Sequence, residues 1–315
     1  MVRNFYITCL FFILNIAAGC GQPNKPQRPE IADADNEKVS RFSFSLAQWS
    51  LHRAIESKKL DPIDFAAKAR ELGFDGIEYV STFYKNKAKD LDYLNQLKTK
   101  AAENKVQSLL IMIDDEGDLG VLDEKKRNQA VENHYKWVDA ASYLGCHSIR
   151  VNLFGTGTET EIADASVLAL KKLSVYAKKK NINVIVENHG GNSSHGVWLS
   201  SVISRVNMSN CGTLPDFGNF CIERENNERW GAPCVREYDR YKGIFELMPF
   251  AKGVSAKSYA FDKDGNETTI DYAKMADIVK KTKFSGFIGI EWEGDGMTEE
   301  EGITATLSLV KKHFF

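Results

Sequence analysis

The 315-residue sequence is poor in several features, and each shortage argues against a class of protein. It has almost no excess charge of either sign, with 41 Lys and Arg against 43 Asp and Glu, a formal net charge of -2 and a pI near 6.3. Nucleic-acid-binding domains usually carry a basic excess or stripe, so we expect no nucleic-acid partner. Cysteine is scarce, at six residues, and no two of them form a Cys-X-X-Cys pair, which argues against a zinc ribbon. The remaining composition, 43% hydrophobic and 27% charged, is that of an ordinary globular chain.

The N-terminal segment differs from the rest of the chain. Its apolar run over residues 5–16 is too short to span a bilayer and has the length of a signal-peptide core. The run ends in Ala17-Ala-Gly-Cys20, which is similar to the bacterial lipobox, where the cysteine is lipidated. We predict a lipoprotein signal peptide over residues 1–19, lipidation at Cys20 and a flexible tether over residues 20–40. Such a protein is exported and held at a membrane, periplasmic or on the cell surface, by its lipid anchor only. The alternative is an ordinary signal peptide cut nearby, with Cys20 incidental.

Four further cysteines follow the N-terminal segment: Cys146, Cys211, Cys221 and Cys234. In an oxidising compartment Cys221 and Cys234 could bridge one long loop. Buried free thiols are the equal alternative, so the sequence leaves the disulfides open.

One pattern recurs from residue 43 onward, a short apolar strand followed by a helix. Eight such alternations in about 270 residues predict a (β/α)₈ TIM barrel over residues 41–315. A doubly wound open sheet is the alternative, but no Gly-rich dinucleotide fingerprint follows the first strand. The expected strands are 43–49, 76–80, 106–113, 148–154, 183–189, 213–217, 253–257 and 287–293, and the expected helices are 62–72, 91–104, 124–143, 161–180, 198–206, 241–247, 270–281 and 298–313. Residues 218–239 are expected to form a long polar loop.

The stretch from Ile182 to Gly191 is the most informative in the chain. Its first half is apolar and β-branched, as in a strand buried on both faces. Its second half places Glu187 and His189 on one face of the strand end and Asn188 on the other. Functional residues of a barrel lie at the C-terminal strand ends, and polar residues gather at the other strand ends too. These are Gln48, Trp49, His52, Glu78, Tyr79, Arg150, Asn152, Asp216, Asn219, Ser255, Lys257, Glu291 and Glu293.

Three of these residues are carboxylates that would meet near the barrel axis: Glu187, Asp216 and Glu291. Like charges at close range need either a cation or raised pKa values. We therefore predict a divalent cation (Mn, Mg, Zn or Co) bound by oxygen and nitrogen ligands, with His189 near enough to join them or to hold substrate. The alternative is a set of salt bridges with Lys257 and Arg150.

The chain resembles the sugar phosphate isomerase/epimerase family, which has a xylose isomerase-like TIM barrel. The resemblance covers residues 43–313 and is carried by four motifs, Glu71-Leu-Gly-Phe-Asp-Gly-Ile-Glu-Tyr79, Val186-Glu-Asn-His-Gly-Gly191, Leu214-Pro-Asp-Phe-Gly-Asn219 and Gly289-Ile-Glu-Trp-Glu293. It implies that Glu187, Asp216 and Glu291 bind a divalent cation together with a strand-seven histidine. That histidine is missing here, where Ser255 and Lys257 stand, and Asn219 replaces a second frequent histidine.

The resemblance implies proton transfer next to a sugar carbonyl. Glu187 and Glu291 would exchange the proton from opposite sides, and a metal or Lys257 would polarise the carbonyl. No phosphate cradle follows strands seven and eight, and an exported protein seldom meets sugar phosphates, so we expect an unphosphorylated sugar, keto-sugar or glycoside. The alternatives are a lyase or hydratase on 3-keto-glycosides and a non-catalytic sugar-binding lipoprotein. Endonuclease-like DNA repair is disfavoured by export, net acidity and too few strand-end histidines.

Five residues are predicted to contact the substrate: His189, Glu78, Arg150, Asn219 and Trp49. Each has a plainer interpretation. Trp49 is more often barrel packing, Arg150 more often a structural ion pair, and the other assignments are near even. Glu293 is expected behind the substrate contacts, His134 and His313 on the surface, and the loop around Trp230 in solvent rather than over the pocket.

Overall fold

The computed structural model describes residues 41–315. The expected signal peptide, the tether and Cys20 lie outside the described residues. Within residues 41–315 no helix is both long and apolar enough to cross a membrane.

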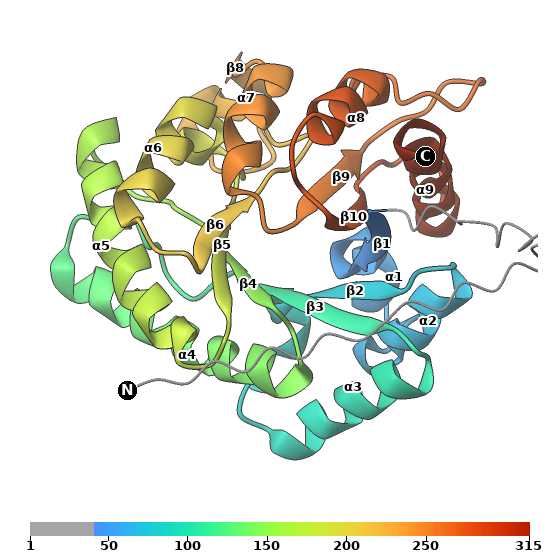
Figure 1. The fold of residues 1–315 in the computed structure, drawn as a ribbon, viewed down its shortest axis with the longest axis horizontal. Coiled ribbons are helices and arrows are strands. Elements are labelled where there is room, and N and C mark those ends of the chain that lie inside the picture. Colours follow the sequence, from blue (N-terminus) through green and yellow to red (C-terminus); the bar gives the residue numbers. More distant parts are fainter. Residues whose placement is uncertain (1–40) are drawn as a thin grey trace, which may run out of the picture. The chain divides into compact units, whose positions relative to one another are not determined.

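Eight parallel strands form one curled sheet, with helices outside it (Figure 1). The ladder order is β6-β5-β4-β3-β2-β1-β10-β9. The two outermost strands of this order, β6 and β9, are joined by the isolated parallel bridges Thr213↔Ala251 and Asp216↔Ser255, which close the barrel. The strands are β1 (Phe42–Ala47), β2 (Gly76–Val80), β3 (Gln107–Met112), β4 (Ser148–Val151), β5 (Asn183–Glu187), β6 (Cys211–Leu214), β9 (Val254–Ser258) and β10 (Gly286–Trp292). The predicted TIM barrel is confirmed.

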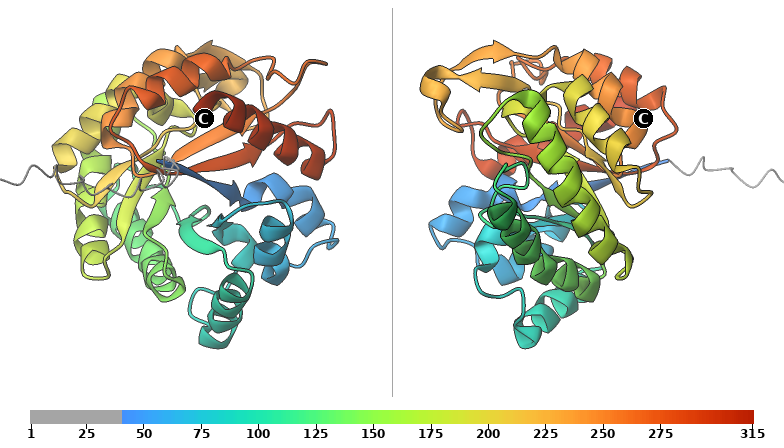
Figure 2. Two further views of the ribbon diagram at one scale, coloured as in Figure 1. Left: turned by 45° about the vertical axis from the view of Figure 1, so that its right-hand side comes forward. Right: turned by 90° about the vertical axis from the view of Figure 1, so that its left-hand side faces the viewer.

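The helices surround the sheet (Figure 2) and follow the strands in alternation. Local sequence sets their ends. Thr158 and Thr298 cap two of them through complete capping boxes with Glu161 and Glu301, and Gly145 ends α4 in the left-handed region at φ 83°. The helices are α1 (His52–Glu56), α2 (Phe65–Glu71), α3 (Leu91–Glu103), α4 (Glu124–Leu144), α5 (Glu159–Lys178), α6 (Gly196–Val206), α7 (Arg240–Leu247), α8 (Tyr272–Lys280) and α9 (Glu299–Phe314).

The apolar residues form two clusters. The larger fills the layer between strands and helices, where the outward residues of each strand meet the inner helix faces. The smaller belongs to the barrel interior and consists of Ala47, Val80, Leu110, Met112, Ile185 and Leu214. Because apolar side chains fill this part of the interior, polar side chains near the strand ends must find partners among one another or in the cleft above.

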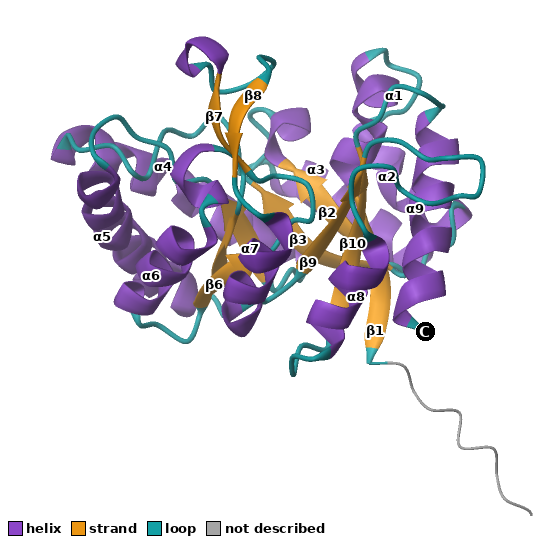
Figure 3. Cartoon of the chain, turned by 90° about the horizontal axis from the view of Figure 1, so that it is seen from above, coloured by secondary structure: helices purple, strands orange, loops and turns teal. Residues whose placement is uncertain are grey.

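Residues 218–239 are not the plain loop that the sequence predicted. They contain an antiparallel hairpin of β7 (Cys221–Arg224) and β8 (Cys234–Glu237), whose strands are joined by a Cys221–Cys234 disulfide. The polar, charged sequence of this segment concealed the strands because both of them lie outside the core. Figure 3 shows the hairpin rising on the side of the barrel opposite the start of β1. The other two described cysteines, Cys146 and Cys211, are buried free thiols.

Candidate functional site

A cleft of about 950 Å³ lies at the C-terminal ends of the barrel strands. Five predicted site residues line it: Trp49, Arg150, His189, Asn219 and Glu291. The other four predicted residues of the barrel, Glu78, Glu187, Asp216 and Lys257, lie beneath this lining and are almost fully buried. The expected site therefore has a lined cleft above and a charged floor below.

Three carboxylates form the centre of this floor. Glu187 comes from β5, Asp216 from the turn after β6, and Glu291 from β10, and one oxygen of each lies within 4.8 Å of the others. The Asp216 carboxylate is fixed by its own turn, since its Oδ1 accepts the backbone N–H groups of Gly218 and Asn219, both at 2.8 Å. The structure thus brings together the three acids that the sequence predicted to converge.

Strand β9 supplies two partners to these acids. The Ser255 hydroxyl lies 2.6 Å from Asp216 Oδ2 and 2.9 Å from Glu291 Oε2. A hydroxyl carries one proton, so it donates to one carboxylate while the other contact needs a proton from the carboxyl itself. Lys257 Nζ lies 3.0 Å from Glu293, 3.4 Å from Glu291 and 3.9 Å from Asp216. Burial opposes its charge, but these carboxylates outweigh burial and raise the pKa of Lys257 well above its usual value.

Arg150 connects the acids to the cleft. Its Nε lies 2.9 Å from Glu187 Oε2, and its Nη1 donates to Asp114 Oδ1 at 2.8 Å. Asn152 also donates to Asp114, at 2.7 Å, which turns its amide oxygen toward His189 Nδ1 at 2.9 Å. His189 must then carry its proton on Nδ1, leaving Nε2 as an acceptor. Burial, with Arg150 and Lys257 nearby, lowers the pKa of His189 well below its usual value, so the ring is neutral.

Two of the three central carboxyls, those of Glu187 and Glu291, have pKa values in the neutral range. Burial, reinforced by Asp216 and Glu291 and opposed by Arg150, raises the pKa of Glu187 to about 8. Burial, reinforced by Glu293 and Asp216 and opposed by Lys257, raises the pKa of Glu291 to about 7. Groups of this pKa can both accept and donate a proton near neutral pH.

The donor set of the floor fits a hard divalent cation. The three acids of the centre, Glu293 and Asp114 lie beside Arg150 and Lys257, so five negative charges meet these two positive ones when all are ionised. The available ligands are carboxylate oxygens, with the Ser255 hydroxyl between two of them and no histidine on β9. All-oxygen sets suit Mg²⁺ or Mn²⁺ better than Zn²⁺, which prefers nitrogen and sulfur.

Several other predicted residues have well-defined surroundings. Glu78 points into the barrel, where its Oε1 accepts from Ser45 at 2.6 Å and its Oε2 has no hydrogen-bond partner in the described part of the chain. Burial raises the pKa of Glu78 to about 7. Trp49 lines the cleft and stacks on His52 and Phe83, with ring centroids 4.7 and 5.9 Å away.

Two surface predictions are wrong. His134 is buried on the helix face that borders the cleft, where it is one of the lining residues, and its Nδ1 lies 2.7 Å from the carbonyl oxygen of Ala130. Trp230 is not surrounded by solvent alone, because its ring lies against His189 in the cleft.

The sequence analysis did not single out Asp114. It follows the expected strand 106–113 directly, so the rule of polar strand ends would have found it. The loop around Trp230 was expected in solvent rather than over the pocket, and yet Arg224, Arg229 and Trp230 line the cleft, where no periodicity of the sequence places them.

Comparison with known proteins agrees with the barrel fold. The family model described as xylose isomerase-like TIM barrel matches residues 66–313. No curated protein matches the sequence. Similar solved structures include a D-psicose 3-epimerase from Clostridium cellulolyticum H10 with D-tagatose (13% identity, TM-score 0.62, covering 86% of this chain and 99% of that one). They also include the 3-keto-D-glucoside 4-epimerase YcjR from E. coli (11%, 0.64, 87% and 99%) and the IolI protein with a zinc atom (15%, 0.63, 86% and 99%). At these identities the likeness shows a common fold.

Proposed function

The chain belongs to the xylose isomerase-like TIM barrel family, and on this premise we propose that it is a sugar isomerase or epimerase. The reaction would move a proton at the carbon next to a carbonyl, on an unphosphorylated sugar or keto-sugar. The observation that carries this proposal is the convergence of Glu187, Asp216 and Glu291 within 4.8 Å beneath a cleft large enough for a sugar. The sugar epimerases of the same fold support it.

A divalent cation fits this floor, and Glu187, Asp216 and Glu291 would hold it. When bound, such a cation supplies Lewis-acid polarisation of a carbonyl or hydroxyl oxygen. Arg150 and Asn219 would orient one of its ligands, since Asn219 Nδ2 donates to Glu187 Oε1 at 2.9 Å and Arg150 lies at the other oxygen.

Proton transfer is assigned to two side chains. Glu291 lines the cleft, so its carboxylate can remove a proton from a bound sugar directly. Glu187 lies behind the Asn219 side chain, and a rotation of that amide would open its carboxyl to the same sugar. The neutral His189 ring would accept a hydrogen bond from a sugar hydroxyl at Nε2. Lys257 would hold Glu291 and Glu293 in place through its ion pairs with them.

Deuterium exchange tests this mechanism. The protein is incubated in D₂O with unphosphorylated ketohexoses and with 3-keto-glucosides, and deuterium next to the carbonyl is measured by mass spectrometry. We expect exchange by the wild type and a fall of about 10²- to 10⁴-fold in Glu291→Gln and in Glu187→Gln, because each loses an acid–base group. Glu132→Gln, at an exposed ion pair with Lys172, is the matched control and should exchange normally.

The same experiment separates the competing functions. Wild-type exchange rates in both Gln variants would refute the mechanism. Release of an aglycone instead of exchange would indicate the lyase, and binding with neither result would indicate a sugar-binding protein.

We also propose that the chain is exported and held at a membrane through a lipid on Cys20. The Cys221–Cys234 disulfide supports export, since such bonds persist in oxidising compartments. Cells grown with labelled palmitate should incorporate label into the wild type and not into Cys20→Ala. Label in both proteins would contradict the proposal.

A further inference from the structure

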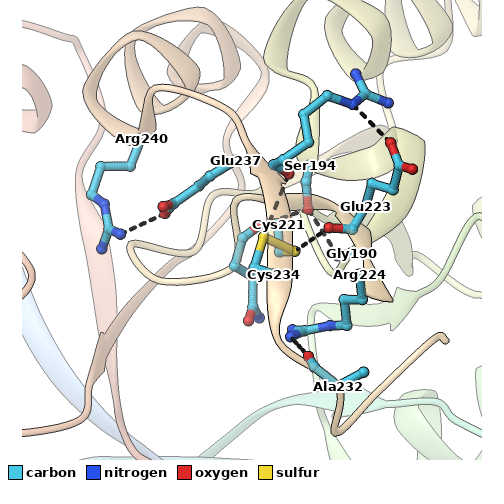
Figure 4. Close-up of a disulfide and its surroundings, with 11 residues drawn as sticks. Gly190, Ser194, Cys221, Glu223, Arg224, Ala232, Cys234, Glu237 and Arg240 are labelled. Carbon is cyan, nitrogen blue, oxygen red and sulfur yellow. Dashed lines mark hydrogen bonds and ion pairs between the residues drawn. A yellow bond between two sulfur atoms is a disulfide. The ribbon is translucent and has the colours of Figure 1, made fainter. Parts of the chain in front are cut away.

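The β7–β8 hairpin carries a loop that reaches over the cleft. The disulfide joins the first residue of β7, Cys221, to the first residue of β8, Cys234, and Arg224 Nη1 donates across the loop to the carbonyl oxygen of Ala232 at 2.8 Å (Figure 4). Glu225 N–H donates to Pro233 O at 3.0 Å. These links hold the loop between the strands in one shape although it packs little against the barrel.

Trp230 is the residue of this loop that meets the site. Its ring centroid lies 4.6 Å from that of His189 and 5.6 Å from that of Phe154. The Trp230 side chain is nevertheless 45% exposed and lines the cleft. His189 thus contacts Trp230 with its ring and Asn152 with its Nδ1.

The loop is also tied to the neighbouring barrel loops. Arg229 donates to Asp118 Oδ2 at 2.8 Å, and its guanidinium lies 4.1 Å from the centre of the Phe154 ring. Asp118 follows β3, Phe154 follows β4 and His189 follows β5, so the loop contacts three segments that follow adjacent strands. These contacts fix the position of Trp230 in the lining of the cleft.

Hydrogen-bond donors and acceptors line the same cleft as Trp230. Arg224 lines the cleft with donors beyond the one it uses on Ala232, and Asp115 and Glu116 line it with carboxylate acceptors. A cleft that combines a partly exposed aromatic ring with hydrogen-bond donors and acceptors suits a sugar ring, which has apolar C–H faces and hydroxyl edges. The cleft, at about 950 Å³, lies at the upper end of the roughly 300–1,000 Å³ range of small-molecule sites, which leaves room beyond one sugar ring at the floor.

We propose that the outer half of the cleft is a subsite for a second sugar ring, stacked on Trp230, so that the substrate is a glycoside of two rings rather than a free monosaccharide. The reacting ring lies over Glu291, and Trp230 sets specificity for the ring attached to it. This inference rests on the proposed function for the identity of the reacting ring, but the subsite itself is defined by binding alone.

Calorimetric titration tests the subsite without any turnover. The probes are cellobiose and maltose, compared with methyl β- and α-D-glucopyranoside, which each offer one ring of the same anomeric configuration. In the wild type we expect at least one disaccharide to bind about tenfold more tightly than its one-ring counterpart. In Trp230→Ala this advantage should vanish while one-ring affinity stays unchanged, and Trp230→Phe should keep part of it, because stacking of a smaller ring persists.

Two further variants complete the experiment. Phe245→Ala, at an exposed aromatic of α7 outside the cleft, should change neither affinity. Cys221→Ser/Cys234→Ser should weaken only the disaccharide, because it frees the loop that holds Trp230. Equal affinity for one and two rings in the wild type, no binding of any probe, or an equal loss for both probes in Trp230→Ala would overturn the proposal. Loss of exchange chemistry with the ring preference intact would instead refute only the proposed function.

Discussion

Lys257→Met probes the charge balance of the site floor. Lys257 is 1% exposed and lies within 4 Å of three carboxylates, those of Glu291, Glu293 and Asp216. Methionine has a similar length, so the change removes the ammonium without leaving a large cavity. Removal of one partner from a buried ion pair typically costs about 3–5 kcal/mol, because the remaining charges stay buried and unpaired. For a domain of this size the loss should lower the melting temperature by roughly 6–20 °C at pH 8.

The pH dependence makes this prediction specific. The raised pKa of Lys257 keeps it charged throughout pH 5.5 to 8, so only the acids titrate in this window. Without Lys257 the pKa of Glu291, already raised to about 7, should rise further, and by pH 5.5 the acids take up protons that replace the lost charge. The loss of melting temperature in Lys257→Met, relative to the wild type, should therefore be smaller at pH 5.5 than at pH 8.

Differential scanning calorimetry of cation-free protein measures both effects. Lys100→Met, which removes an exposed ammonium paired with Asp64, is the matched control and should melt as the wild type does. A deficit at pH 8 no larger than that of the control, or one that is the same at both pH values, would refute the reasoning.

Two further predictions concern the same barrel end. Manganese or magnesium added at about 100 times its dissociation constant should stabilise the wild type by about 2.7 kcal/mol. At a fixed metal concentration, the rise in melting temperature should be larger at pH 8 than at pH 5.5. Glu187 and Glu291, with pKa values of about 8 and 7, must lose their protons before they can bind the metal. An equal rise at both pH values would contradict the assigned ligands. Gly289→Ala should lower the free energy of unfolding by about 1–3 kcal/mol, measured by chemical denaturation, because the new Cβ would come within 2.5 Å of Glu78 Oε1. Gly296→Ala is the control, since a Cβ there meets open space, and it should be nearly neutral. Similar losses in both variants would show that crowding against Glu78 is not the cause.

The barrel and the acid cluster were both predictable from the sequence, for physical reasons. Strands buried on both faces leave apolar runs, as in β5, and the polar residues that follow them mark the cleft because all parallel strands end at one edge. That rule placed Glu187, Asp216 and Glu291 together without any knowledge of side-chain positions. It would also have placed Asp114 had it been applied to the residue after the third strand.

The rest depended on tertiary packing that no local pattern records. His134 lies in a helix with charged neighbours, and only the packing of α4 against the barrel buries it. The β7–β8 strands are short, polar and exposed, so they lack the alternation that reveals a half-buried strand. Whether Cys221 and Cys234 pair depends on the hairpin register, and Trp230 comes to His189 only because that hairpin folds back over the cleft.

The way the barrel closes has a consequence for its dynamics. Between β6 and β9 the described strands share two isolated bridges where the neighbouring strand pairs form ladders, and the Asp216 and Ser255 pair is one of them. Hydrogen bonds such as Ser255 N–H to Pro215 O should exchange with solvent through local opening at a lower free energy than those of β1 or β4. A ligand that binds Asp216, Glu291 and Ser255 together would add a further connection between the end of β6 and strand β9. Ligand binding at the site and closure of the barrel between β6 and β9 are then coupled. A bound ligand should slow amide exchange at this closure, and local opening of the closure should weaken ligand binding.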